Sequence, residues 1–453
     1  MTTGASVLTE DRLGDGSAPA VGDPGAPVRA EGAANAVSTL GSIGNTASSH
    51  NNESKSLNNW RFVRQAAARE LLPHRPVAYC LRRPVPEAQA IEVWKPEQGG
   101  AYYRHLMTCD SIWECPVCAG KITERRRRAL KSVLSPTIQI VVLDESGNEQ
   151  TLTRPKYYLA MATFTLSHRA PESCWGVLKR VQRAYKRMWS GRFAQSFKQR
   201  HSIIGTLRAI EPTHGDSGWH PHIHTLFISD SPITGLQEVT MLSELRDAWV
   251  HAVSKAGGYA TAEHGVDLIT GDEAVGAYIV KMGNGDDEGW TISAEMTKYP
   301  TKRGRDGMSL WQLLDAYIAG DVAAGELWLE GVGAMKGTRH IAPSPGLWEK
   351  LGIESLDDYA GEMGGEEALG QKLAEMPLEA WQVIIRHDLR GELLARANAG
   401  SLRAFFAELG IDIVLSSTEA NKFAGDRGPP AQITMFLDDP DDGILFPDSE
   451  SGL

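Results

Sequence analysis

The sequence lacks the features that mark secreted and membrane proteins. It shows no N-terminal signal peptide with a charged start, an apolar centre and a small-residue cleavage site. Its apolar runs all stay short of the roughly 18 residues that a transmembrane helix needs. Only five of the 453 residues are cysteines, an odd number that disfavours a disulfide framework. We therefore expect a cytoplasmic protein with no membrane partner.

Positive charge is in short supply on average, yet it is unevenly placed. The 46 lysines and arginines, against 57 aspartates and glutamates, give a formal net charge of -11, which by itself disfavours a polyanionic partner. Basic residues are concentrated in the middle of the chain, whereas the acidic residues lie in the tails and the C-terminal region. The average charge therefore does not exclude a nucleic-acid partner.

Composition divides the chain into five predicted segments. The first is rich in small and polar residues and cannot bury enough apolar surface to offset chain entropy, so we expect it to be disordered. The segments are a disordered N-terminus at 1–56, a cysteine-containing basic module at 57–155, a central α+β domain at 156–285, a mostly helical C-terminal region at 286–435 and an acidic tail at 436–453.

The central segment alternates between the two periodicities of regular structure. β-Branched and aromatic residues predict strands at 157–168, 203–213, 222–229 and 265–270. Apolar residues at helical spacing predict helices at 174–193, 236–257 and 272–282, with an earlier helix at 60–72. This order predicts an α+β fold in which helices cover one face of an antiparallel sheet.

Three histidines stand at alternate positions where a strand is expected. Alternate residues of a strand share one face, so His222 and His224 point to the same side. His220 joins them only if the strand extends back through the intervening proline, which removes a ladder hydrogen bond. The expected third ligand of a divalent metal ion is Glu211, on the preceding strand, in preference to His214 in the loop. The alternative is a set of surface histidines at a strand end.

Three of the five cysteines lie close together in the sequence. Cys115 and Cys118 form a CPVC knuckle, and Cys109 lies six residues before it. A structural Zn²⁺ site takes four ligands, and Cys80 is the expected fourth, with His105 as the alternative. The rival interpretation is a redox pair, which usually starts a helix in a βαβ unit. We predict structural zinc.

Two basic segments favour nucleic-acid binding. One directly follows the cysteines, and the other is the predicted helix at 174–193, where aromatic residues alternate with basic ones. Basic faces with aromatic residues are typical of nucleic-acid interfaces, whereas the alternative is an ordinary solvated helix face. The expected contacts are Arg125, Arg126, Lys179, Arg183, Lys186 and Arg187.

A tyrosine follows the last predicted strand and supplies a candidate nucleophile. Tyr278 and Lys281 are one helical turn apart and share a face. A tyrosine phenolate can attack phosphorus, and the lysine would lower the phenol pKa or neutralise the phosphate. The alternatives are a tyrosine that is merely packed, and a second candidate nucleophile, Tyr299, between Lys298 and Lys302.

The motifs, in this order, resemble those of plasmid rolling-circle replication initiators, the Rep family of the HUH endonuclease superfamily. ATFTLSH (162–168) resembles the first motif, WHPHIHTLF (219–227) the second and AYIVKM (277–282) the third. The stretch CDSIWECPVCAGKITERR and the block KGTRHIAPSPGLWEKLG (336–352) are similar to stretches of actinobacterial initiators. The likeness runs from about residue 78 to 355.

The resemblance implies a fold and a mechanism. The fold would be an HUH-type antiparallel sheet with helices packed on it, and 156–285 would be a nicking domain. Mg²⁺ or Mn²⁺ at the histidines would polarise the scissile phosphate of single-stranded DNA at a replication origin. Tyr278 would attack it, leaving a free 3′-OH and a covalent 5′-phosphotyrosine. A host helicase and polymerase are the further partners implied.

The chain departs from the family pattern at one position. Some initiators carry a glutamate four residues before the tyrosine, where it activates water to end the cycle, but this position is Ala274 here. Glu273 lies roughly 100° away around the helix, and Asp272 precedes it, so these are the acids available for termination.

Other functions compete with replication initiation. The chain could be another HUH nuclease, such as a relaxase or a single-strand transposase, or a non-cleaving zinc-containing DNA-binding regulator. An ordinary metal-dependent hydrolase is disfavoured, because Leu226 and Phe227 stand where the HxHxDH pattern has aspartate and histidine.

Overall fold

The computed structural model describes residues 51–271, except 98, 144, 145 and 147, together with residues 307–362 and 370–415. Positions 1–50 of the predicted disordered segment (1–56) lie outside these residues. Its last six positions belong to helix α1 (Asn51–Leu71). The predicted helix at 272–282 and the acidic tail also lie outside them. None of the described helices is both long and apolar enough to cross a membrane.

Five antiparallel strands form the main sheet, in the order β10-β5-β9-β6-β12. They are β5 (Tyr158–Phe164), β6 (Ile203–Glu211), β9 (His222–Ser229), β10 (Val266–Thr270) and β12 (Ile341–Pro343). The connection between β6 and β9 joins a small sheet of β11 (Met308–Ser309), β7 (Thr213–Gly215) and β8 (Gly218–Trp219). The antiparallel sheet of an α+β fold is therefore confirmed.

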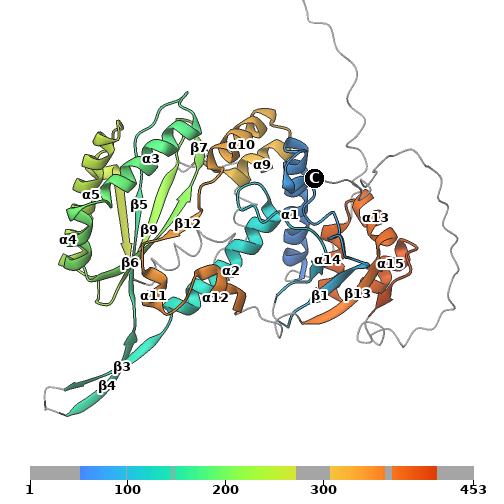
Figure 1. Cartoon of the computed structure of the whole chain (residues 1–453), viewed down its shortest axis with the longest axis horizontal. Coiled ribbons are helices and arrows are strands. Elements are labelled where there is room, and N and C mark those ends of the chain that lie inside the picture. Colours follow the sequence, from blue (N-terminus) through green and yellow to red (C-terminus); the bar gives the residue numbers. More distant parts are fainter. Residues whose placement is uncertain are drawn as a thin grey trace, which may run out of the picture. The chain divides into compact units, whose positions relative to one another are not determined.

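Helices cover both faces of the main sheet, so the prediction of a single covered face is wrong (Figure 1). On one face lie α3 (Cys174–Met188), α4 (Arg192–Arg200) and α5 (Leu236–Lys255). On the other lie α2 (Pro116–Leu134), α11 (Leu347–Leu351) and α12 (Leu356–Glu362). Phe227 of β9 packs into the first layer and Leu226 into the second. Because both faces of β9 are apolar, each face has to be covered.

The predicted helix at 174–193 is two helices. α3 ends at Met188 and α4 begins at Arg192. Gly191, between them, has φ of +133°, a conformation that side chains with a Cβ rarely adopt. The break turns α4 so that Phe197 packs beneath Trp189, with ring centroids 5.6 Å apart.

A second sheet joins parts of the chain that are far apart in sequence. Its order is β14-β13-β1-β2. The strands are β1 (Ala90–Lys95), β2 (Tyr102–Arg104), β13 (Gln371–Pro377) and β14 (Val414–Leu415). They share a core with α13 (Leu378–Arg386), α14 (Arg390–Ala399) and α15 (Leu402–Glu408). β13 runs antiparallel to β1, within a region for which the sequence predicts mostly helix.

The remaining elements lie between the two sheets or beside them. Helices α9 (Leu310–Ile318) and α10 (Val322–Met335) contact α1 and α3, respectively. The hairpin of β3 (Thr137–Leu143) and β4 (Glu149–Pro155) extends away from the sheets (Figure 1). A short α6 (Ala262–Gly265) precedes β10, and a 3₁₀ turn, η1 (Pro76–Ala78), precedes the first cysteine of the cluster described below.

Candidate metal centres and nucleic-acid interface

A carboxylate and two imidazoles converge where β6 and β9 meet. In the antiparallel register Glu211 lies opposite His222, and Ala209 lies opposite His224, so all these side chains share one face. Oε2 of Glu211 lies 3.2 Å from Nε2 of His222 and 3.4 Å from Nε2 of His224. The three ligand atoms lie within 4.8 Å of one another. The structure thus brings together the three residues selected from the sequence, which form the Glu-His-His triad.

Neighbouring groups fix the orientation of both imidazole rings. Nδ1 of His224 lies 3.0 Å from the hydroxyl of Thr163 on β5, and Nδ1 of His222 lies 3.1 Å from the carbonyl of His220. Because each partner oxygen can accept a hydrogen bond from a protonated Nδ1, each ring can present an unprotonated Nε2 toward Glu211. The histidine motif at 219–227 does not reveal that Thr163 helps to orient the ring of His224, although the two residues are paired in the strand register.

The chemistry of this donor set fits a divalent metal ion. Two imidazole nitrogens and one carboxylate oxygen suit Mn²⁺ and similar ions, whereas Mg²⁺ prefers a set of oxygens. Partial burial raises the pKa of Glu211, but hydrogen bonds from His222 and then His224 lower it by more, so the net pKa lies well below its usual range. Glu211 is therefore a carboxylate at neutral pH, as metal ligation requires.

Two further histidines lie near the triad without joining it. β9 begins at His222, after the proline, and His220 turns instead to His168, with Nδ1 and Nε2 2.6 Å apart. Burial lowers the pKa of His220 most, and charge repulsion from His222 and His168 lowers it further, to about 4. His214 lies on β7, where its ring meets Trp219 edge-on at 5.1 Å.

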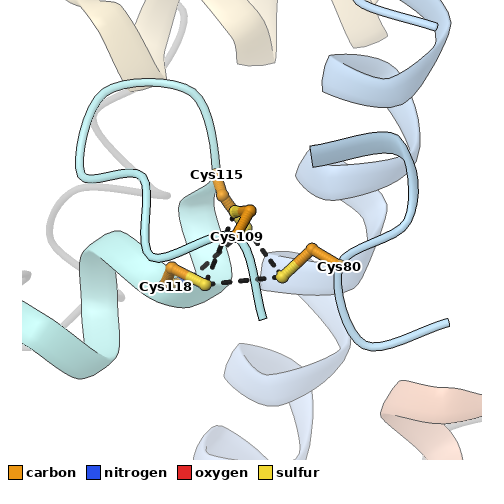
Figure 2. A group of neighbouring side chains, drawn as sticks. All are labelled: Cys80, Cys109, Cys115 and Cys118. Carbon is orange, nitrogen blue, oxygen red and sulfur yellow. Dashed lines mark hydrogen bonds between the residues drawn. The ribbon is translucent and has the colours of Figure 1, made fainter. Parts of the chain in front are cut away.

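Four cysteines form a second group of candidate ligands (Figure 2). Cys80 follows η1, Cys109 lies in a loop, Cys115 caps α2, and Cys118 occupies its first turn. The sulfur of Cys80 is 3.4 Å from that of Cys118 and 3.7 Å from that of Cys115. Sulfurs around a tetrahedral Zn²⁺ are about 3.8 Å apart, given Zn–S bonds of about 2.3 Å, so the cluster fits such an ion.

Two polar side chains support this cysteine cluster. Nε2 of Gln65 on α1 donates to the sulfur of Cys115 at 3.3 Å. Nη1 of Arg390 donates to Oε1 of Gln65 at 2.7 Å and to the carbonyl of Cys80 at 3.4 Å. Several thiol hydrogen bonds lower the pKa of Cys115, and the one from Cys109 has the largest effect. Arg390, at the start of α14, is fully buried. A helix that packs on the second sheet therefore contributes a positive charge to the surroundings of the cysteine cluster.

The alternative zinc ligand, His105, and the fifth cysteine, Cys174, lie elsewhere. Nδ1 of His105 lies 3.2 Å from the carbonyl of Ala90, and its Nε2 lies 3.8 Å from Glu92. Cys174 is buried at the start of α3, and burial raises its pKa to about 12. The sulfur of Cys80, not the imidazole of His105, is therefore the fourth member of the cluster.

The predicted basic contacts differ in their surroundings. Arg126 makes a bidentate ion pair with Asp357 of α12, at 2.6 and 2.7 Å, and Arg125 is exposed beside it. On α3, Lys179 and Lys186 line a cleft. Arg183 and Arg187, predicted to share their face, are exposed but do not line it.

The predicted nucleophile and its helpers lie outside the described residues. Tyr278, Lys281 and Glu273 all fall between positions 272 and 306, as does the alternative Tyr299. For Tyr278, Lys281 and Glu273 the closest described strand in sequence is β10, which pairs with β5 at the edge of the main sheet, whereas for Tyr299 it is β11.

Comparison with known proteins gives two partial likenesses. No protein-family model matches the chain. The chain is similar to the protein named Protein rep of Streptomyces lividans, with 24% identity over 375 residues, or 67% of this chain and 77% of that protein. It is also similar to a Neomycin resistance protein of Streptomyces cyanogenus, with 27% identity over 187 residues, or 33% of this chain and 39% of that protein.

Proposed function

We propose that this chain is a plasmid rolling-circle replication initiator that cuts and rejoins single-stranded DNA at a replication origin. The observation that carries the proposal is the Glu-His-His triad, built from adjacent antiparallel strands on one face of the main sheet. The similarity to a protein named Protein rep supports a role in replication. The order of the sequence motifs supports nicking of HUH type.

Each residue of the proposed site has a role that its chemistry allows. Glu211, His222 and His224 would hold Mn²⁺ or Mg²⁺, and such an ion withdraws charge from a bound phosphate. The phenolate of Tyr278 would attack the scissile phosphorus, forming a phosphorus–oxygen bond to the 5′ side. The 3′ oxygen would leave with the bonding electron pair and take up a proton to become a 3′-OH. Lys281 would neutralise the phosphate, and Glu273 would activate water at termination.

The cysteine cluster would serve the same protein as a structural Zn²⁺ site. Its ligands come from the turn after η1, the loop after β2 and the start of α2. A bound ion would fix the start of α2, and with it Arg125 and Arg126, against the main sheet. We place the protein in the cytoplasm, with a host helicase and polymerase as its partners at the origin.

A strand-specific nicking assay tests this function. Single strands that tile both strands of the replicon are incubated with the protein and Mn²⁺ or Mg²⁺, and a denaturing gel separates nicked DNA from the protein–DNA adduct. We expect one strand to be cut and an adduct to form. We expect Tyr278→Phe to abolish the adduct and Tyr299→Phe to retain it. Loss with Tyr299→Phe alone would keep the enzyme class but move the nucleophile.

Matched histidine variants separate metal binding from general damage. His222→Ala should abolish nicking, whereas His264→Ala should not, because the His264 side chain is 80% exposed and lies outside the triad. Tight DNA binding with no nick or adduct under any metal would contradict the proposal and favour a non-cleaving regulator. Cutting at a transfer origin or at a transposon end would favour a relaxase or a transposase.

A further inference from the structure

A cleft of about 620 Å³ opens between α3 and the edge of the main sheet. The cleft lies on the face of the main sheet opposite the Glu-His-His triad. Arg208 of β6 and Thr225 of β9 are paired and point to the cleft side, whereas the next pair in the register points to the triad side. Three separate segments form its lining, namely α3, β6 and the loop before β12. The side chains that matter are Lys179, Tyr185, Lys186, Trp189, Arg208 and Arg339.

The lining carries four cations and no carboxylate. Within the described part of the chain, Lys179, Lys186, Arg208 and Arg339 form no ion pair, in contrast to Arg126 with its bidentate partner on α12. Lys179, Lys186 and Arg339 are exposed. Like charges gathered without partners repel one another, so an anion that enters the cleft is favoured.

Two aromatic rings form one wall of the cleft. The hydroxyl of Tyr185 is 2.9 Å from that of Thr225, and Trp189 packs on Phe227 with centroids 5.8 Å apart. The guanidinium of Arg208 lies 5.9 Å from the centroid of the Tyr185 ring. Both rings are thus held in place while remaining partly exposed, as a platform for stacking a base requires.

The cleft lies close to the triad along the chain, although it opens on the other face. Arg339 lines it, and the carbonyl of the next residue, His340, accepts a hydrogen bond from Ile210, directly before Glu211. The loop from Gly337 to His340 therefore connects the cleft with the strand end that carries the triad. Duplex DNA is stiff, with a persistence length of about 50 nm, so we expect a single strand rather than a duplex to follow this edge.

We propose that the cleft binds an unpaired nucleotide of the DNA strand that is held at the triad. The base would stack on Tyr185 and Trp189, and the flanking phosphates would contact Lys186, Arg208 and Arg339. The choice of DNA as the ligand rests on the proposed function, but base binding needs no cleavage. Lys179 and Lys186, two of the DNA contacts predicted from the sequence, line this cleft, whereas Arg183 and Arg187 lie outside it.

Photocross-linking locates the base directly. An oligothymidylate that carries 5-iodouracil is bound to the full-length protein without added Mn²⁺ or Mg²⁺ and irradiated, and the cross-links are mapped by mass spectrometry. We expect cross-links at Tyr185 or Trp189. Cross-links confined to other residues would overturn the proposal. Equal cross-linking of the same oligonucleotide in a duplex would also overturn it, and competition by thymidine monophosphate at equal concentration would show a free-nucleotide site instead.

Affinity measurements provide the second test. Trp189→Leu keeps an apolar side chain in the core and should weaken binding by about five- to 160-fold if one stacked base is lost. The double variant Arg208→Ala, Arg339→Ala should lower the salt slope of binding by about 1.4 if two phosphate contacts are lost. Arg403→Ala, an exposed arginine on α15, is the matched control and should change neither quantity. Unchanged affinity and slope in the cleft variants would refute the site.

The two proposals fail in different ways. Nicking that persists while cleft variants bind normally would leave the proposed function standing without the cleft. Cross-linking to Trp189 in a protein that never nicks would leave the cleft standing as a single-strand site without the nuclease.

Discussion

Replacing Thr163 by valine should weaken metal binding at the triad without disturbing the fold. The hydroxyl of Thr163 is 3.0 Å from Nδ1 of His224, and His224 is 1% exposed, so water cannot readily replace it. Valine has the same shape and favours a strand, so β5 is preserved. The change therefore removes one acceptor and little else.

The size of the effect follows from where the imidazole proton can go. Without metal, the His224 ring in the variant can carry its proton on Nε2, 3.4 Å from Glu211. A bound ion occupies Nε2 and forces the proton to Nδ1, where valine offers no acceptor. Loss of the hydrogen bond between Nδ1 and Thr163 costs about 0.5–1.5 kcal/mol. That cost falls on binding alone and corresponds to a loss of about two- to 13-fold in affinity.

Calorimetric titration with Mn²⁺ measures this loss. Thr225→Val is the matched control, because it makes the same substitution on the next strand but faces Tyr185 on the opposite side of the sheet. We expect Thr163→Val to bind Mn²⁺ more weakly and Thr225→Val to bind it as the unmodified chain does. Equal affinities for the two variants, at equal thermal stability, would refute the role given to Thr163.

Five further variants, two of them matched controls, test the cysteine cluster and the packing. Cys118→Ser should release Zn²⁺, measured by elemental analysis after gel filtration, whereas Cys174→Ala should keep it, and retention by both would contradict a four-cysteine site. Gly331→Ala places a Cβ 2.5 Å from a neighbouring side chain and should destabilise the fold by about 1–3 kcal/mol in urea. Gly333→Ala, on the same helix with open space, should stabilise it by about 0.5–1 kcal/mol, and equal effects would refute the packing argument. Arg390→Met should cost about 1–3 kcal/mol, because the buried amide oxygen of Gln65 loses its donor, and a midpoint unchanged in urea would contradict this.

The triad could be located from the sequence because each step needed only local rules. The period of two along β9 puts His222 and His224 on one face, and an antiparallel neighbour brings Glu211 alongside. The cysteine knuckle was equally visible, and Cys80 was the natural fourth ligand. The roles of these residues, and those of Tyr278 and Lys281 outside the described residues, stay predictions.

What could not be predicted depends on contacts between distant segments. Nothing in the spacing of Arg126 reveals that Asp357 will lie against it. The cleft is invisible for the same reason, since Trp189, Arg208 and Arg339 come from three separate parts of the chain. The second covered face of the sheet was missed because α2, α11 and α12 lie outside the strand–helix alternation from which the fold was predicted.

The pairing of β1 with β13 has a consequence for how the protein is made. Arg390 comes 310 residues after Cys80, whose carbonyl it binds. At about 5–20 residues per second, a ribosome needs about 15–60 s to translate that interval. For most of this time β1 can pair with β2 but lacks β13, while all four cysteines are synthesised and able to take up zinc. Metal capture would thus precede closure of the core of the second sheet, and nascent chains stopped before residue 371 would expose one open edge of β1 to chaperones and proteases.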